Sequence, residues 1–258
     1  MLGKTQIKYI QSLRQKKYRH ANGLYVIEGE KIVNEYIAPG YSLSNIYAVE
    51  EWLDENLALL RKKNLPFTKI SERELKQISS LATPNKVVAL ARLPGLTTPE
   101  ELSILLTKGL HLALETIQDP GNLGTIIRTA DWFGVDSIIC SDDCVDAYNP
   151  KVVQSAMGSL ARVKIIYATD LTNLKGLSNL PVYAATLDGE NIFEEKLPKN
   201  AIILIGNESK GLSESLIRTA TKQISIPRFG KAESLNAAVA GAIILSHFRK
   251  LQTPNSKL

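Results

Sequence analysis

The sequence predicts two α/β domains, a smaller N-terminal one and a larger C-terminal one built on a parallel sheet. From about residue 106, short apolar strands alternate with helical segments, which is typical of parallel strands joined by crossover helices. A stretch rich in proline, glycine and threonine, residues 94–105, precedes this region and resembles a linker. A chain of 258 residues is also long enough for two domains. We therefore expect domains over residues 1–93 and 106–258.

Residues 1–93 are expected to form a small α/β unit. The turn signal Asn22-Gly23 introduces the first apolar strand, and apolar residues recur at helical spacing in the segments that follow. Strands are expected over residues 24–27, 46–49, 67–70 and 87–93, and helices over residues 30–37 and 51–62.

Residues 106–258 are expected to alternate between strands and helices. Gly134 is a natural left-handed helix stop, Pro150 suits a first helical turn, and Ser213 can cap a short helix. Strands are expected over residues 111–117, 135–140, 163–167, 182–185, 202–205 and 224–226, and longer helices over 122–133, 150–160 and 235–250.

Composition excludes several classes of protein. The hydrophobic content of 44% and charged content of 22% are those of a globular protein, and no apolar run of eighteen residues is present. The N-terminus is basic and lacks a signal-peptide core, so we expect a cytoplasmic protein. Cys140 and Cys144 lie four residues apart with only three histidines in the chain, so we expect reduced thiols and no metal site.

The positive charge is concentrated at the N-terminus. The chain carries a formal net charge of +5, and residues 1–20 contain no acidic residue. Such a segment can neutralise phosphates, although a solvated basic helix explains the composition equally well. The candidate RNA contacts in this segment are Arg14, Lys16, Lys17 and Arg19.

Three loops stand out because each follows a buried strand, where open α/β sheets bind their ligands. The first, residues 118–124, contains two glycines and leads into a helix that bears Arg128. The backbone N–H groups at such a helix start can bind an anion, and Asn122 is expected to act at the cap. A glycine turn before a helix is common, so this loop alone is a weak signal.

The second and third loops carry polar residues in the same context. Residues 206–211 follow the strand at 201–205, and glycine at both ends is explained by close approach of the backbone to a ligand. Glu208 could order this loop or meet a cation. Residues 227–236 lead into the last helix, where Ser234 is the expected cap and Asn236 is a second polar residue; capping alone could explain either.

Other nucleotide-binding and hydrolytic sites are not supported. The chain contains no GxxxxGK[ST] and no GxGxxG after a strand, which excludes a P-loop and a dinucleotide fingerprint. None of the histidines lies in a loop suited to a Ser-His-Asp triad.

Taken together, the three loops resemble the SpoU (TrmH) family of RNA ribose methyltransferases, within the SPOUT class. The matching motifs are Asp119-Pro120-x-Asn122-Leu123-Gly124 with Arg128-Thr129-Ala130, then Ile205-Gly206-Asn207-Glu208-x-x-Gly211-Leu212, then Ile226-Pro227-x-x-Gly230-x-x-Glu233-Ser234-Leu235-Asn236. Residues 8–93 are more weakly similar to the ribosomal-protein-like substrate-binding domain found in many members.

The resemblance implies a parallel sheet with a deep C-terminal trefoil knot, an exception to the rule against threading. It also implies an obligate homodimer and S-adenosylmethionine as the methyl donor, held largely by backbone groups. By position, the expected cofactor-binding residues are Thr186, Leu187, Gly189, Ile205, Gly206, Asn207, Gly211, Ile226, Ser234 and Leu235.

The same resemblance places Arg128 at the attacking ribose and in contact with RNA. It implies four further catalytic residues around it, namely Asn122, Glu208, Ser234 and Asn236. A guanidinium stays protonated at physiological pH and is a poor base, so we expect Arg128 to stabilise the developing alkoxide. The proton acceptor stays open between a phosphate, a water and Glu208.

Some alternatives remain. Members of the family often carry an Arg-Ala-Ser run where this chain has Gln154-Ser155-Ala156, so RNA contacts there are in doubt. We expect ribosomal RNA as the substrate, with transfer RNA as the alternative. An idle RNA-binding protein on the same scaffold and a base methyltransferase are the competing functions.

Overall fold

The computed structural model describes residues 1–37 and 41–250, and the chain divides into two compact units. The first unit consists of Met1–Gly95 together with Asp146–Ala161. The second consists of Leu96–Val145 and the chain from Arg162 onwards. The chain leaves the first unit next to the expected linker, but the return of a later segment to this unit was not predicted.

The first unit is built on a four-stranded sheet with the order β1-β4-β2-β3. Strand β4 is antiparallel to both β1 and β2, whereas β2 and β3 are parallel. The four expected strands and both expected helices are present, and three further helices (α1, α2 and α5) were not predicted. The elements are α1 (Lys4–Ser12), α2 (Lys16–Asn22), β1 (Leu24–Glu28), α3 (Glu30–Ile37), β2 (Leu43–Ala48), α4 (Glu50–Lys62), β3 (Phe67–Lys69), α5 (Glu72–Ile78) and β4 (Val87–Arg92).

Residues 146–161 belong to the first unit through specific contacts. Helix α8 (Pro150–Ala156), followed by the short 3-10 helix η1 (Ser159–Ala161), packs against β1. The Gln154 side chain donates to the Glu28 carbonyl at 3.1 Å, and the Tyr41 hydroxyl donates to the Leu160 carbonyl at 3.2 Å. Gln154, at the departure from the family pattern, therefore has its amide engaged by the protein backbone.

The second unit is built on a six-stranded parallel sheet, which confirms the predicted fold class. The strand order is β10-β8-β9-β5-β6-β7, and every neighbouring pair is parallel. The strands are β5 (Leu110–Leu114), β6 (Ser137–Ser141), β7 (Lys164–Ala168), β8 (Val182–Asn191), β9 (Ala201–Ile205) and β10 (Lys222–Ser225). Helix α6 (Pro99–Leu105) precedes these strands and α11 (Ala237–Arg249) follows them. The other helical elements of this unit lie between the strands: α7 (Pro120–Trp132), η2 (Leu171–Asn173), α9 (Leu174–Leu177), η3 (Ile192–Glu194) and α10 (Glu214–Ile217).

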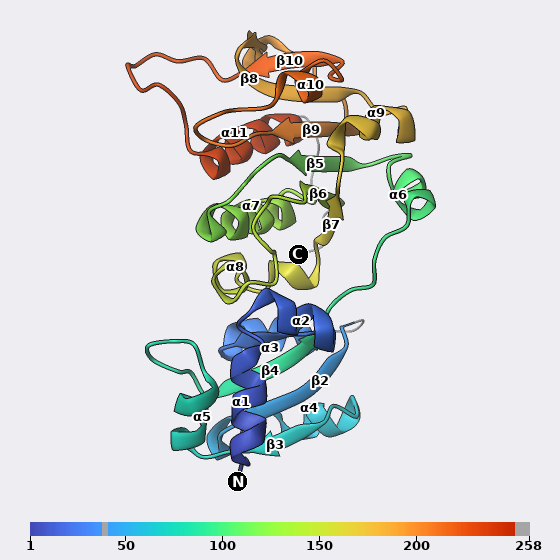
Figure 1. The fold of residues 1–258 in the computed structure, drawn as a ribbon. Helices are drawn as coiled ribbons and strands as arrows, with labels where there is room; N and C mark the ends of the chain where they lie inside the picture. Colours follow the sequence, from blue (N-terminus) through green and yellow to red (C-terminus); the bar gives the residue numbers. More distant parts are fainter. Residues whose placement is uncertain (38–40, 251–258) are drawn as a thin grey trace. The chain divides into compact units, whose positions relative to one another are not determined.

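Helices cover both faces of this sheet, as a buried parallel sheet requires. Successive side chains of a strand point to opposite faces, so Leu204 packs with α6, α9 and α10 while Ile205 contacts Gly241 of α11. Helices α7 and α11 lie next to each other (Figure 1). Because both helices begin beside the carboxyl ends of strands, their first turns border one edge of the sheet.

The expected linker, residues 94–105, is partly helical. Thr98 caps α6 in a capping box with Glu101, and Pro99 occupies the first turn. Leu102 is buried in the core of the second unit. Thr98 and Pro99, which were expected to lie in a linker, therefore begin a helix, and the structure differs from the expectation over residues 98–105. Within residues 1–37 and 41–250, no helix is both long and apolar enough to cross a membrane.

Candidate active site

The three loops singled out in the sequence converge at the carboxyl edge of the parallel sheet. They follow β5, β9 and β10, and all strands of this sheet run in the same direction. Ligands of open α/β sheets bind at this edge, because the loops there leave a crevice.

Three polar side chains, one from each loop, form a continuous hydrogen-bonded network. The Asn122 amide donates to Glu208 Oε1 at 2.5 Å. The Asn236 amide donates to Asn122 Oδ1 at 2.9 Å. Asn122 thus uses both ends of its amide, and each of the three motifs contributes one member. The predicted site residues Asn122, Glu208 and Asn236 are brought together.

The helix caps differ from those expected. Asp119, not Asn122, caps α7 by accepting from the Asn122 backbone N–H at 2.8 Å. Asn236, not Ser234, caps α11 by accepting from the backbone N–H groups of Ala238 and Val239. Because Asp119 takes over the capping role, the Asn122 side chain is available for the network. The Asn236 side chain has both roles. Its amide oxygen caps α11, and its amide nitrogen donates to Asn122.

Arg128 and Ser234 are not part of this network. Arg128 lies on an exposed face of α7, with Thr125 and Trp132 at helical spacing on the same face. Across the described part of the chain, its guanidinium forms no hydrogen bond or ion pair. Ser234 is exposed in the loop before α11. A guanidinium that is exposed and has no partner in the described chain is available to an anionic ligand.

The predicted cofactor residues on β8 lie in an excursion of that strand. The residues paired with Gln223 and Ile224 of β10 are Ala184 and Glu190, so residues 185–189 have no counterpart in the β10 register. Thr186, Leu187 and Gly189 belong to this excursion. Thr186 Oγ1 is buried, and it has no hydrogen-bond partner within residues 1–37 and 41–250. A buried hydroxyl left unpaired at the ligand-binding edge suits a ligand that supplies the missing partner.

The glycines of these segments are required by the close approach of the chain to itself. A Cβ on Gly206 would lie 2.3 Å from the Gly211 carbonyl carbon, so loop 206–211 closes on its own backbone. A Cβ on Gly189 would lie 2.5 Å from the Ile224 carbonyl carbon. Gly211 has a φ of +67°, which favours glycine. These glycines shape the loops at the edge of the sheet.

The residues that hold the loops together were not predicted from the sequence. Both Glu115 carboxylate oxygens accept from Ser213, one from its backbone N–H and one from its hydroxyl, each at 2.6 Å. The Asn207 amide donates to the Thr116 carbonyl at 3.0 Å. Glu115 and Thr116 directly follow the buried strand β5, which is the one sequence signal that could have indicated them.

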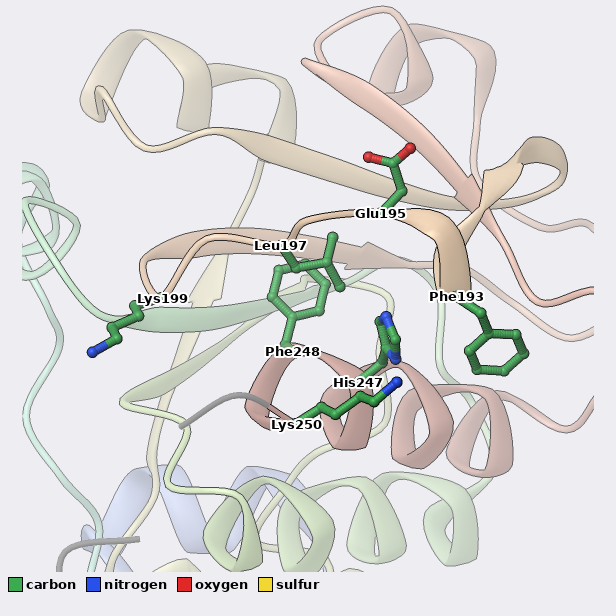
Figure 2. A pocket seen from close by; sticks show the side chains of 7 residues that line it. All are labelled: Phe193, Glu195, Leu197, Lys199, His247, Phe248 and Lys250. Atoms are coloured by element: carbon green, nitrogen blue, oxygen red, sulfur yellow. The ribbon is translucent and has the colours of Figure 1, made fainter. Parts of the chain in front are cut away.

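A separate pocket lies between the segment after β8 and the C-terminal end of α11 (Figure 2). Its volume of about 180 Å³ is below the roughly 300–1,000 Å³ of pockets for drug-sized ligands. None of the predicted catalytic or cofactor-binding residues lines it. The lining side chains are Phe193, Glu195, Leu197, Lys199, His247, Phe248 and Lys250.

The predicted RNA-binding residues of the first unit fall into two groups. Lys16 and Lys17 are exposed, and Arg14 is exposed although it donates to the Ser79 carbonyl at 2.6 Å. Arg19 is only 2% exposed, pairs with Asp146, and also donates to the carbonyls of Leu13 and Arg14. Arg19 is therefore unsuited to a phosphate contact, and its role in this structure is to fix the buried Asp146.

The described residues include no metal-binding group of side chains, and both cysteines are free thiols. In the part of the chain that the structure describes, no three histidine, cysteine, aspartate or glutamate side chains form a metal-binding group. Cys140 and Cys144 are both free and buried. Hydrogen bonds from Cys140, Ser141 and the Ile117 backbone outweigh burial and lower the pKa of Cys144 to about 7.

Comparison with known proteins defines the class. Residues 109–246 match the SpoU rRNA Methylase family, and residues 4–89 match the MRM3-like substrate binding domain. The chain is 30% identical to the 23S rRNA (guanosine(2553)-2'-O)-methyltransferase RlmP of Bacillus subtilis, over 95% of this chain and 96% of that protein. The class is that of RNA methyltransferases.

Solved structures agree with this assignment. A TrmH-family protein from Porphyromonas gingivalis has a TM-score of 0.84 and 34% identity, covering 97% of this chain and 99% of that one. An AdoMet-bound rRNA methyltransferase from Sinorhizobium meliloti has a TM-score of 0.86 and 27% identity, covering 98% of both chains. The chain belongs to the SpoU rRNA methylase family.

Proposed function

We propose that this protein transfers a methyl group from S-adenosylmethionine to a ribose 2′-hydroxyl of ribosomal RNA, of the 23S type. The observation that carries the proposal is the network of Asn122, Glu208 and Asn236, one residue from each family motif. The first motif also supplies Arg128, which is exposed. Relatives that match nearly the whole chain are named as 23S rRNA 2'-O-methyltransferases, which supports ribosomal RNA over transfer RNA.

The residues at the sheet edge fit the methyl donor. Residues 185–189, with the unpaired Thr186 hydroxyl, would hold it together with the residues around Gly206, Ile226 and Leu235. When bound, S-adenosylmethionine supplies a methyl group activated by a sulfonium, which needs only a positioned and deprotonated oxygen as acceptor. The protein therefore has to orient the ribose and stabilise negative charge.

Arg128 is the residue suited to the charge. As the ribose hydroxyl loses its proton, a guanidinium nearby stabilises the alkoxide and the adjoining phosphate. Glu208 receives a hydrogen bond from Asn122, which fixes the direction of its carboxylate. We assign Glu208 and Asn122 to orienting the site, and Glu208 remains one of three candidates for the proton, with a phosphate oxygen and a water.

We also propose that the enzyme acts as a homodimer through the exposed face of α7 and α11. These helices contact each other, and each carries an exposed apolar side chain: Trp132 of α7 is 85% exposed and Val239 of α11 is 48% exposed. Arg128 lies on the same face, so dimerisation would bring it close to a second chain. The trefoil knot implied by the family resemblance remains a prediction.

The direct test is to incubate the protein with methyl-labelled S-adenosylmethionine and ribosomal RNA, then digest the RNA to nucleosides. We expect the label in a 2′-O-methylnucleoside. Label on a base would replace the ribose assignment with base methylation. Labelling of transfer RNA alone would overturn the ribosomal substrate, and binding of RNA without any label would support an idle binding protein.

A further inference from the structure

Thr116 has an unusual backbone conformation at the end of β5. Its φ is +57°, in the left-handed region that β-branched residues rarely adopt. A residue held in such a conformation persists only where its surroundings enforce it, and such residues cluster at functional sites. Thr116 immediately precedes the loop that carries Asp119 and Asn122.

The surroundings that enforce this conformation are specific. The Thr116 backbone N–H donates to Ser141 Oγ at 3.0 Å, and its hydroxyl donates to Asp143 Oδ2 at 2.6 Å. Ser141 in turn donates to Asp143 Oδ1 at 2.5 Å. Both oxygens of the Asp143 carboxylate are therefore used to hold Thr116 from the loop after β6. These two hydrogen bonds also lower the pKa of Asp143 below its ordinary value.

The consequence is the direction of the Thr116 carbonyl. It accepts from Asn207 Nδ2 at 3.0 Å, in the loop after β9. Asn207 Oδ1 then accepts from the backbone N–H groups of Ser209 and Lys210 at 2.8 and 3.2 Å. The Asn207 side chain thus joins Thr116 to the turn that flanks Glu208.

We propose that Thr116 is a positioning residue for methyl transfer. Its left-handed backbone, held by Ser141 and Asp143, aims its carbonyl at Asn207 and thereby sets the loop that presents Glu208 to Asn122. The role in catalysis rests on the proposed function, whereas the effect on the loop does not. Thr116 acts through Asn207 and does not itself touch the reacting atoms.

The test uses three substitutions in the full-length protein. Thr116→Val keeps the branched shape and removes the hydroxyl, whereas Thr116→Ser keeps the hydroxyl and serves as the conservative rescue. Thr172→Val is the matched control, because Thr172 also donates to an aspartate, Asp170 Oδ1 at 2.6 Å, in the same unit but on η2.

The first measurement is amide hydrogen exchange without RNA or methyl donor. We expect Thr116→Val to speed exchange across residues 206–213 while leaving β10 unchanged, and Thr116→Ser and Thr172→Val to match the wild type. Unchanged exchange in residues 206–213 of Thr116→Val would overturn the proposal, whatever the protein's activity. Should Thr116→Val not fold, Asp143→Ala removes the acceptor of the Thr116 hydroxyl and carries the same expectation.

The second measurement is methyl transfer under saturating substrates. We expect Thr116→Val to lower kcat by about 10- to 100-fold, the range for misplacing a site by about an ångström. In a Glu208→Gln background the same change should cost less than about twofold, because both act on one loop. Independent, multiplicative losses would contradict positioning through Glu208. Absence of transfer by the wild type would refute the proposed function and leave the exchange result standing.

Discussion

At the scale of single residues, the side chains of the site differ in whether they form hydrogen bonds within the protein. Asn122, Glu208 and Asn236 bond to one another, whereas Arg128 is exposed and has no partner in the described chain. Arg19 shows the opposite situation, since its guanidinium is buried against Asp146. Two arginines predicted to contact RNA thus have different roles.

Replacing Arg128 tests the charge-stabilising role. Arg128→Ala should lower kcat by about 100- to 1,000-fold, as removal of one preorganised donor does elsewhere. Arg128→Lys should also be impaired, since an ammonium lacks the planar guanidinium fork. Affinity for S-adenosylmethionine, measured by calorimetry, should stay within about twofold, on the order expected for a residue outside its binding loops. Full activity of Arg128→Ala would remove Arg128 from the mechanism.

Arg19 and Lys17 should separate stability from RNA binding. Arg19→Ala leaves Asp146 buried without its partner and should cost about 3–5 kcal/mol of unfolding free energy, measured by denaturant titration. Lys17→Ala, at an exposed position, should change stability by less than about 0.5 kcal/mol. It should instead weaken RNA binding and reduce the salt dependence by about one counterion. Equal stability of both variants would contradict the structural role of Arg19.

At the scale of elements, loops and helix starts determine where the side chains lie. The sequence predicted most strands and helices correctly, because buried parallel strands are apolar runs and glycine or proline marks their ends. It failed where two residues compete for one role: Asp119 and Asn236 are the caps, where Asn122 and Ser234 were expected. Tertiary hydrogen bonds such as that of Asn207 to Thr116 join distant loops, and no local pattern encodes them.

Asn236 combines a cap and a site contact, and two substitutions should separate them. Asn236→Ala removes both and should cost about 1 kcal/mol of stability along with activity. Asn236→Asp keeps a good cap, so stability should be retained. It places a carboxylate beside Asn122 and Glu208, however, and kcat should fall by about tenfold or more. An active Asn236→Asp enzyme would show that the cap alone matters.

The closure of the second loop predicts a contrast between two glycines. Gly206→Ala places a methyl group against the Gly211 backbone and should cost about 1–3 kcal/mol, as overpacking does. Gly230→Ala meets no atom within 4 Å and should change stability by less than about 0.5 kcal/mol. Thermal unfolding of both variants measures the difference, and a harmless Gly206→Ala would contradict the closed loop.

At the scale of the whole molecule, we propose that the two units have different functions. The first unit matches a substrate-binding domain, and the second carries the three family motifs. Residues 146–161 were assigned from the sequence to the second domain because a chain usually stays within one domain; their contacts place them in the first. Sequence periodicity reports how a helix is buried but not against which partner.

The proposed dimer is tested by charging its apolar face. Trp132→Glu should convert the protein to a monomer in sedimentation velocity and abolish methyl transfer. Ile104→Glu is the matched control, since Ile104 is 72% exposed on α6, away from α7 and α11. The control should sediment like the wild type. A wild type that sediments as a monomer at micromolar concentration would exclude the dimer.

We propose that this protein methylates a ribose of ribosomal RNA and that Arg128 takes part in the reaction. The most direct measurement maps 2′-O-methylation across total RNA from cells lacking the gene, complemented with the wild type or with Arg128→Ala. We predict that one position in the large-subunit ribosomal RNA loses its methyl group, and that only the wild type restores it. An unchanged ribosomal RNA map would contradict the proposed substrate. Restoration by Arg128→Ala would contradict the proposed role of Arg128.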